Sequence, residues 1–142
     1  MSTMTKVFVR ANVFLFKMTN GRLGSRMGRQ SVLLLHTVGR KSGKPYSTPL
    51  SYYRDGDAYL IVASNWGNED SPEWFRNLVQ HPRTTIQVKG TTLQVEARLS
   101  DGEEYQRLWE VVTRQNSQYL AYQKTLTRQI PIVILTLVSQ PG

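Results

Sequence analysis

Residues 31–64, SVLLLHTVGRKSGKPYSTPLSYYRDGDAYLIVAS, contain three strand-like runs separated by two turns. The runs 31–38 and 58–64 are short and apolar, which is typical of strands buried on both faces. The run 46–54 between them also predicts a strand. Its Pro49 requires a sheet edge or a bulge, because proline has no amide hydrogen for a central ladder. A tight DGD turn precedes the third run, so this stretch predicts antiparallel hairpins.

The rest of the chain adds helices and more hairpin structure. The further elements expected are a helix at 72–80, strands at 84–89, 91–99 and 130–138, and one or two helices within 101–122. Helices do not alternate regularly with strands, which favours an antiparallel α+β barrel of about six strands with flanking helices. A chain of 142 residues has the usual size of one domain, so we expect residues 1–142 to form a single unit.

Residues 1–29 precede this body and are expected to form a helix and a basic loop. The segment 4–18, MTKVFVRANVFLFKM, predicts an amphipathic helix that is apolar over most of its circumference, with Lys6, Arg10 and Lys17 on one side. This helix either packs on the body or on a partner subunit, or it rests on an anionic membrane surface. The chain has no run of 18 apolar residues and no clear signal peptide. We therefore expect a cytoplasmic monomer or homodimer, with peripheral contact at the inner membrane face as the alternative.

The distribution of charge points to an anionic partner. Ten of the 18 Lys and Arg residues precede Asp55, whereas all 10 acidic residues lie at Asp55 or beyond. Such a basic segment suits nucleic acid, a membrane surface or a phosphorylated ligand. Nucleic acid is disfavoured, because the tyrosines of 46–54 alternate with few cations. The absence of cysteine excludes thiolate catalysis and thiolate zinc sites, and two histidines are too few for a histidine-rich metal site, so no metal is expected.

The strongest local signal is Gly39-Arg40-Lys41-Ser42-Gly43-Lys44, between the first two predicted strands. Glycines allow the backbone to approach an anion closely, and successive amides in such a turn form an anion-binding concavity. Arg40 can form a bidentate contact with a phosphate, while Lys41 acts as a point charge. The spacing does not match a Walker loop. A solvated basic turn is the structural alternative.

Two aromatic groups form further candidate sites. Ser64-Asn65-Trp66 follows a predicted strand and precedes the helix that carries Trp74. The indoles could stack on a planar ring to which Ser64 and Asn65 donate hydrogen bonds; core packing is the alternative, especially for Trp74.

Tyr119 and Tyr122 lie three residues apart, on one face of a predicted helix. They could line a pocket for an aromatic acceptor, or they could simply close the barrel. No Ser/His/Asp grouping indicates hydrolysis.

Two stretches, LLLHTVGRKSGKPYSTPLSYYRDGDAYLIVASNWGNEDSPEWFRNLVQHP (33–82) and SQYLAYQKTLTRQIPIVILTL (117–137), resemble the deazaflavin-dependent nitroreductase and quinone reductase family. The resemblance covers about residues 30–138. It implies a split β-barrel related to flavin reductases. It also implies coenzyme F420, a 5-deazaflavin with a phosphodiester and a polyglutamate tail, as the hydride carrier, and a quinone or nitroaromatic as the acceptor.

The resemblance also implies site residues. The residues expected to hold the phosphate and the acidic tail are Arg40, Lys41, Ser42, Gly43 and Lys44; those expected along the deazaflavin are Pro49, Leu50, Ser64, Asn65, Trp74 and Asn77. Tyr119 and Tyr122 match tyrosines that line the acceptor pocket. One position departs from the family pattern: a further pocket tyrosine is replaced by Asn116, which implies a wider or more polar acceptor site.

The resemblance leads to a mechanistic hypothesis. The protein would orient the reduced deazaflavin against the acceptor and exclude water, while the hydride chemistry belongs to the cofactor. Tyr119 and Tyr122 would position the acceptor, and Ser64 would donate a hydrogen bond to the developing anion. The alternatives are the same barrel with FMN, an F420-dependent reductase of another acceptor, and a non-catalytic deazaflavin-binding protein.

Overall fold

The computed structural model describes residues 31–138. The strands are β1 (Val32–Val38), β2 (Pro45–Ser51), β3 (Tyr53–Asp55), β4 (Ala58–Val62), β5 (Arg83–Val88), β6 (Thr91–Leu99) and β7 (Ile132–Leu137). The helices are α2 (Glu73–Gln80), α3 (Gly102–Gln115) and α4 (Gln118–Thr125), with a short 3-10 turn, η2 (Asn65–Gly67). The helix expected at 4–18 lies outside the described residues.

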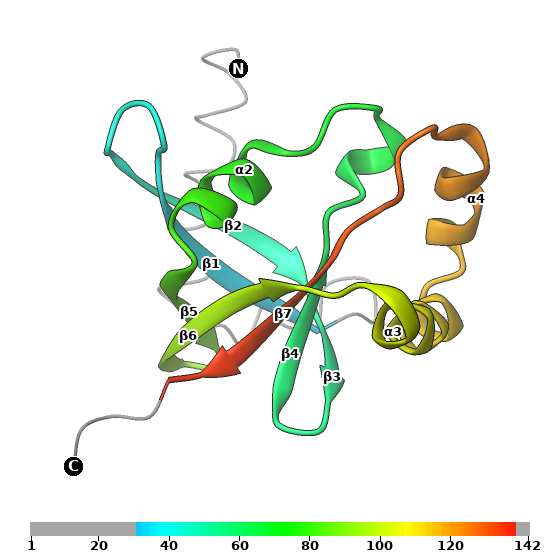
Figure 1. Ribbon diagram of the computed structural model, residues 1–142. Helices are drawn as coiled ribbons and strands as arrows, with labels where there is room; N and C mark the ends of the chain where they lie inside the picture. The colour runs from blue at the N-terminus through cyan, green and yellow to red at the C-terminus, as the bar shows by residue number, and fades with distance from the viewer. Residues whose placement is uncertain (1–30, 139–142) are drawn as a thin grey trace.

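The seven strands within residues 31–138 form one antiparallel sheet in the order β2-β1-β5-β6-β7-β4-β3. β2 and β3 lie at opposite ends of this order, although Tyr52 alone separates them in the chain. The sheet must therefore curl until its two ends meet, as Figure 1 shows. The predicted antiparallel α+β architecture is confirmed, and the curled sheet is consistent with a split β-barrel.

The single strand predicted at 46–54 is wrong in one respect, because the structure divides it at Tyr52. The Tyr52 amide donates to the Ser31 carbonyl at 3.0 Å, and its side chain is buried in the core. The break is needed because one segment serves both ends of the curled sheet, and it raises the expected six strands to seven. Pro49 lies on β2, opposite Leu34 of β1, and β2 is an edge strand of the sheet order, so of the two expected alternatives the sheet edge is the one observed.

Two large buried clusters and a small one, Val32 with Leu34, fill the part of the molecule that the structure describes. The larger includes Leu33, Leu35 and Trp74, with α2 packed against β1 and β6. The second includes Tyr105 and Tyr119 and lies between β4, β7 and the pair α3 and α4. Figure 1 places α2 near the β1–β2 hairpin, and α3 with α4 on the other side of the molecule. Within residues 31–138, no helix is both long and apolar enough to cross a membrane.

Candidate functional site

The hairpin between β1 and β2 is compact and presents cations to solvent. The Gly39 amide donates to the Lys44 carbonyl at 2.8 Å, and the Gly43 amide donates to the Gly39 carbonyl at 2.8 Å. A Cβ on Gly39 would lie 2.6 Å from the Ser42 Oγ, and Gly43 has a φ of +70°, so both positions favour glycine. Lys41 and Lys44 are exposed. The loop therefore presents two lysines on a backbone that favours glycine at two positions.

Arg40 points away from these lysines and toward α2. Its Nη1 donates to the Glu73 Oε2 at 2.6 Å and to the Asn77 Oδ1 at 3.0 Å, and its backbone amide donates to the same Asn77 oxygen at 3.2 Å. The Arg40 hydrogen bond holds the pKa of Glu73 below its ordinary value. Arg40 thus fastens the hairpin to α2, whereas Lys41 and Lys44 are the exposed cations of this hairpin.

The two residues predicted on α2 have different surroundings. Asn77 is 5% exposed and its side-chain oxygen accepts from Arg40, so the structure brings these two predicted residues together. Trp74 is 9% exposed, belongs to the larger core cluster and makes an edge contact with Phe75. Core packing, the alternative expected for Trp74, thus accounts for most of its side-chain surface.

The loop after β4 holds Ser64, Asn65 and Trp66 in an unusual backbone conformation. Asn65 and Trp66 have φ values of 49° and 57°, in the left-handed region. Non-glycine residues held there cost roughly 1–3 kcal/mol each and are found most often at functional sites. The Asn65 side chain donates to the Asp70 carbonyl at 2.8 Å, and the indole of Trp66 is 83% exposed.

Helix α4 places its two predicted tyrosines differently. The ring of Tyr122 packs against η2 so closely that a Cβ on Gly67 would lie 2.8 Å from it. Tyr119 is 7% exposed, and its hydroxyl lies 3.0 Å from that of Tyr53. Burial raises the pKa of Tyr119, so it stays a neutral phenol. Tyr122 thus borders the loop that carries Ser64, whereas Tyr119 lies in the second core cluster.

The remaining predicted residues lie on β2 and beside Tyr119. Pro49 and Leu50 are half-buried on β2, and Leu50 packs against the larger core cluster. The Nδ2 of Asn116 lies 3.5 Å from the Tyr53 hydroxyl, so Asn116 borders the tyrosine pair. Direct contact of any of these residues with a cofactor or an acceptor stays a prediction.

The partners that hold these residues were not predicted from the sequence. Glu73 pairs with Arg40, and its place in the first turn of a predicted helix was the available signal. Tyr53 pairs with Tyr119 across 66 residues of chain, a relation that no local pattern reveals. Within residues 31–138, no group of three or more His, Cys, Asp and Glu side chains could hold a metal ion.

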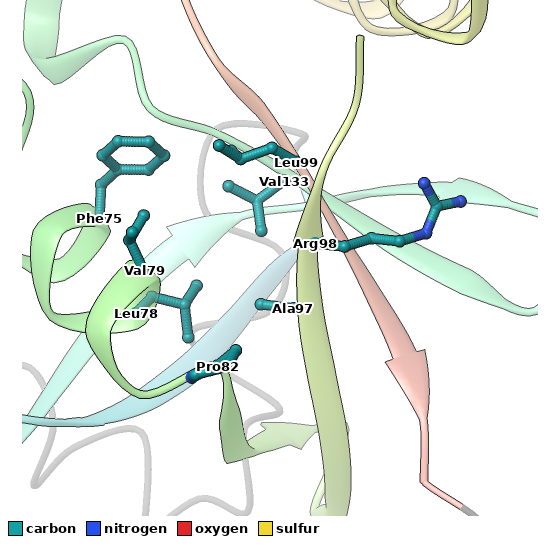
Figure 2. Close-up of a pocket in the computed structure, with 8 residues that line it drawn as sticks. All are labelled: Phe75, Leu78, Val79, Pro82, Ala97, Arg98, Leu99 and Val133. Carbon is teal, nitrogen blue, oxygen red and sulfur yellow. The ribbon is translucent and has the colours of Figure 1, made fainter.

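A cavity of about 290 Å³ lies between α2, β6 and β7 and contains none of the predicted site residues. Its lining consists of Phe75, Leu78, Val79, Pro82, Ala97, Arg98, Leu99 and Val133. In Figure 2 the Arg98 guanidinium points away from the apolar side chains, and it is hydrogen-bonded to Glu104. Arg98 is the polar residue of this lining, and its charged group points away, so none of the lining side chains offers the cavity a polar group that would orient a ligand.

Solved structures identify the class of protein to which this fold belongs. One, described as an F420-H2-dependent reductase (FDR-A), is 31% identical with a TM-score of 0.68, covering 73% of this chain and 92% of its own. Another, described as a domain-swapped dimer, is 29% identical with a TM-score of 0.71, covering 94% of this chain and 99% of its own. The fold is thus shared with a reductase that depends on F420-H2.

Sequence comparisons identify the family. The model of the F420H(2)-dependent quinone reductase family matches residues 8–137. An F420H(2)-dependent quinone reductase of Mycobacterium tuberculosis is 42% identical over 132 residues, which span 90% of this chain and 89% of the relative. This chain belongs to the F420H(2)-dependent quinone reductase family.

Proposed function

We propose that this chain catalyses hydride transfer from reduced coenzyme F420 to a quinone, with nitroaromatics as further acceptors. The observation that carries the proposal is the family match over residues 8–137, since the family description names both the donor and the acceptor. The relative in M. tuberculosis carries the same description at 42% identity. The FMN alternative has no such support.

The chemistry of the hairpin fits an anionic cofactor. F420 carries a phosphodiester and an acidic tail, and the exposed hairpin lysines are suitable donors. When bound, the deazaflavin supplies the hydride. Lys41 and Lys44, with Ser42 and Gly43 between them, would hold the anionic part. Arg40 would contribute chiefly by fixing the hairpin to α2, since its guanidinium already contacts Glu73 and Asn77.

The planar part of the cofactor would lie between β2, α2 and the loop after β4. Pro49, Leu50 and Trp74 would supply apolar contacts, and Ser64 would donate a hydrogen bond to charge that develops during the transfer. The side-chain amide of Asn65 already donates within its own loop, so its free contribution would be its side-chain oxygen.

The acceptor would be positioned on the α4 side. Tyr122 is half-buried against η2 and would form a flat wall beside the loop of Ser64. Tyr119 is paired with Tyr53, and direct contact with the acceptor would require its hydroxyl to change partner. A homodimer and contact of residues 4–18 with a membrane surface also belong to this proposal. The solved domain-swapped dimer supports the former, and the apolar, basic composition of 4–18 supports the latter.

The direct test mixes the purified protein with reduced F420 and menadione at low oxygen and follows the absorbance of the oxidised deazaflavin. Protein-dependent oxidation is expected. Binding of F420 without oxidation by any quinone or nitroaromatic would indicate the non-catalytic alternative, and absence of binding would overturn the cofactor assignment.

A variant pair tests the hairpin separately. Lys41→Ala/Lys44→Ala is expected to weaken F420 binding at least tenfold in a titration, because it removes the two exposed cations. Lys124→Ala, which removes an exposed lysine of α4, is the control and should bind as the wild type does. Equal affinities would show that the hairpin does not hold the acidic part.

A further inference from the structure

One guanidinium holds the loop that follows β4. Arg128 lies in the segment between α4 and β7, about sixty residues away in the chain. Its Nη1 donates to the Ala63 carbonyl at 3.1 Å and its Nη2 to the Ser64 carbonyl at 2.9 Å. Its Nε and Nη2 donate to the Asn68 carbonyl at 3.1 and 2.8 Å. Three donor atoms of a rigid, planar group thus bind both ends of η2.

The same two segments are joined at further points. The Thr127 amide and hydroxyl donate to the Glu69 carboxylate at 2.7 and 2.6 Å, and these hydrogen bonds hold the pKa of Glu69 below its ordinary value. The Ala63 amide donates to the Pro131 carbonyl at 3.0 Å. We call these contacts, with those of Arg128, the latch between 63–69 and 127–131.

The loop needs such a latch, because its backbone is held in an unfavourable conformation. Asn65 and Trp66 are both in the left-handed region, and Trp66 gains little from burial, since it is 83% exposed. Residues in such conformations persist only where the surrounding structure fixes them. The guanidinium suits this task because its donors have a fixed spacing, whereas an ammonium is a single point charge.

We propose that Arg128 is a positioning residue for the reaction. By holding the carbonyls of Ala63, Ser64 and Asn68, it fixes Ser64 and the exposed indole of Trp66 relative to the ring of Tyr122, and hence the cofactor side of the site relative to the acceptor side. The inference rests on the proposed function for its consequence in catalysis. Its structural part, the ordering of 64–69, does not depend on that function.

The test compares Arg128→Ala and Arg128→Lys with Arg107→Ala. Arg107 is the control, because its guanidinium also donates hydrogen bonds, in this case two to the Asp55 carboxylate on the surface. Three quantities are measured: hydrogen exchange of the 64–69 amides, kcat and KM with reduced F420 and menadione, and the effect on kcat of free guanidinium at non-denaturing concentrations.

Arg128→Ala is expected to speed exchange in 64–69 and to lower kcat by about tenfold or more, because small displacements of positioning groups are costly. Guanidinium should restore part of the lost kcat in this variant, but not change the wild type or Arg107→Ala. Arg128→Lys should show exchange rates in 64–69 and a kcat between those of the wild type and Arg128→Ala. If Arg128 only stabilised the fold, Arg128→Ala would have a lower melting temperature, and guanidinium would not restore its kcat.

The proposal is overturned if folded Arg128→Ala keeps wild-type exchange and kcat, or if its kcat loss matches that of Arg107→Ala or does not respond to guanidinium. If Arg128→Ala does not fold, Arg128→Lys decides the question, and wild-type exchange and kcat in that variant overturn it. If the wild-type protein neither binds nor oxidises reduced F420, the proposed function is refuted instead. The hydrogen-exchange data then test only whether Arg128 orders residues 64–69.

Discussion

Asn77 joins the β1–β2 hairpin to helix α2. Its side-chain oxygen accepts both the backbone amide and the Nη1 of Arg40, and the side chain is 5% exposed. The single side-chain oxygen of Asn77 thus accepts two donors of the hairpin residue Arg40. Glu73 adds an ion pair whose carboxylate side chain is 61% exposed, and pairs with an exposed partner contribute little to stability.

Asn77→Ala is therefore expected to lower the free energy of unfolding by about 1–3 kcal/mol, the usual cost of leaving buried polar groups unpaired. It should also weaken F420 binding, since the hairpin loses its anchor. Denaturant unfolding and a fluorescence titration measure the two effects. Gln80→Ala, at an exposed position of the same helix, is the control. Equal stability of the two variants would contradict this account of Asn77.

Gly67 provides a second prediction for a single residue. It has a φ of +81°, and an added Cβ would lie 2.8 Å from the Tyr122 ring. Gly56 also has a positive φ, +58°, but a Cβ added there would meet nothing within 4 Å. Gly56→Ala should therefore cost about 1 kcal/mol of unfolding free energy through the backbone alone. Gly67→Ala should cost more and raise KM for the quinone, because Tyr122 must move; equal costs would show that the close approach is unimportant.

Among the elements, β3 and α4 are joined by a pair of buried tyrosines. The hydroxyls of Tyr53 and Tyr119 lie 3.0 Å apart, and the rings meet edge to face with centroids 6.1 Å apart. β3 is a short strand at one end of the sheet order, so this contact attaches α4 to one end of the curled sheet.

A double-mutant cycle with Tyr53→Phe and Tyr119→Phe measures that attachment. Each single variant is expected to lose about 1 kcal/mol or more of unfolding free energy, because a hydroxyl is left without its partner. The double variant should lose less than the sum of the two. Strict additivity would mean that the two hydroxyls do not interact.

The buried tyrosines also predict the behaviour of the protein in alkali. Burial raises the pKa of Tyr105 to about 12 and raises that of Tyr119 as well. A folded pKa above the unfolded value of about 10 means that the fold favours the neutral phenol. The stability this provides is complete below about pH 10 and is lost as the pH rises through the folded pKa.

The absorbance of tyrosinate should therefore show a late fraction among the 7 tyrosines, and the free energy of unfolding should fall above about pH 10. Tyr105→Phe should reduce the late fraction. Titration of all tyrosines in one step near pH 10 would contradict the burial of this pair.

The charge of the whole molecule is separated along the chain. The net charge is +8, and the acid-free segment before Asp55 holds ten cations. Lys41 and Lys44 belong to this segment and lie on the hairpin. A polyanionic ligand should be attracted to the hairpin that carries Lys41 and Lys44, and dissolved salt should screen this attraction.

The affinity for F420 is accordingly expected to fall as the salt concentration rises, and the dependence should be weaker in Lys41→Ala/Lys44→Ala. Titrations over a range of sodium chloride concentrations measure both slopes. The same slope in wild type and variant would place the electrostatic contact elsewhere on the molecule.

Local patterns were sufficient for most elements but not for their partners. Alternating and apolar runs with turn residues predicted the hairpins and the helix α2, because these signals lie within a few residues of each other. They could not predict the break at Tyr52, which follows from closure of the sheet. They also could not separate Arg40 from Lys41, since adjacent cations look alike until the partner of one, Glu73, is brought near.

Residue types at short or fixed spacing predicted the antiparallel α+β architecture, a sheet edge or a bulge at Pro49, and the basic character of the hairpin, and the resemblance of residues 33–82 and 117–137 indicated the family. The folded chain was needed to show that Arg40 is a structural anchor, that Tyr119 is paired with Tyr53, and that Arg128 holds the loop of Ser64. These contacts join residues 33 to 66 positions apart. They exist because the curled sheet brings distant segments together, and no local pattern encodes that proximity.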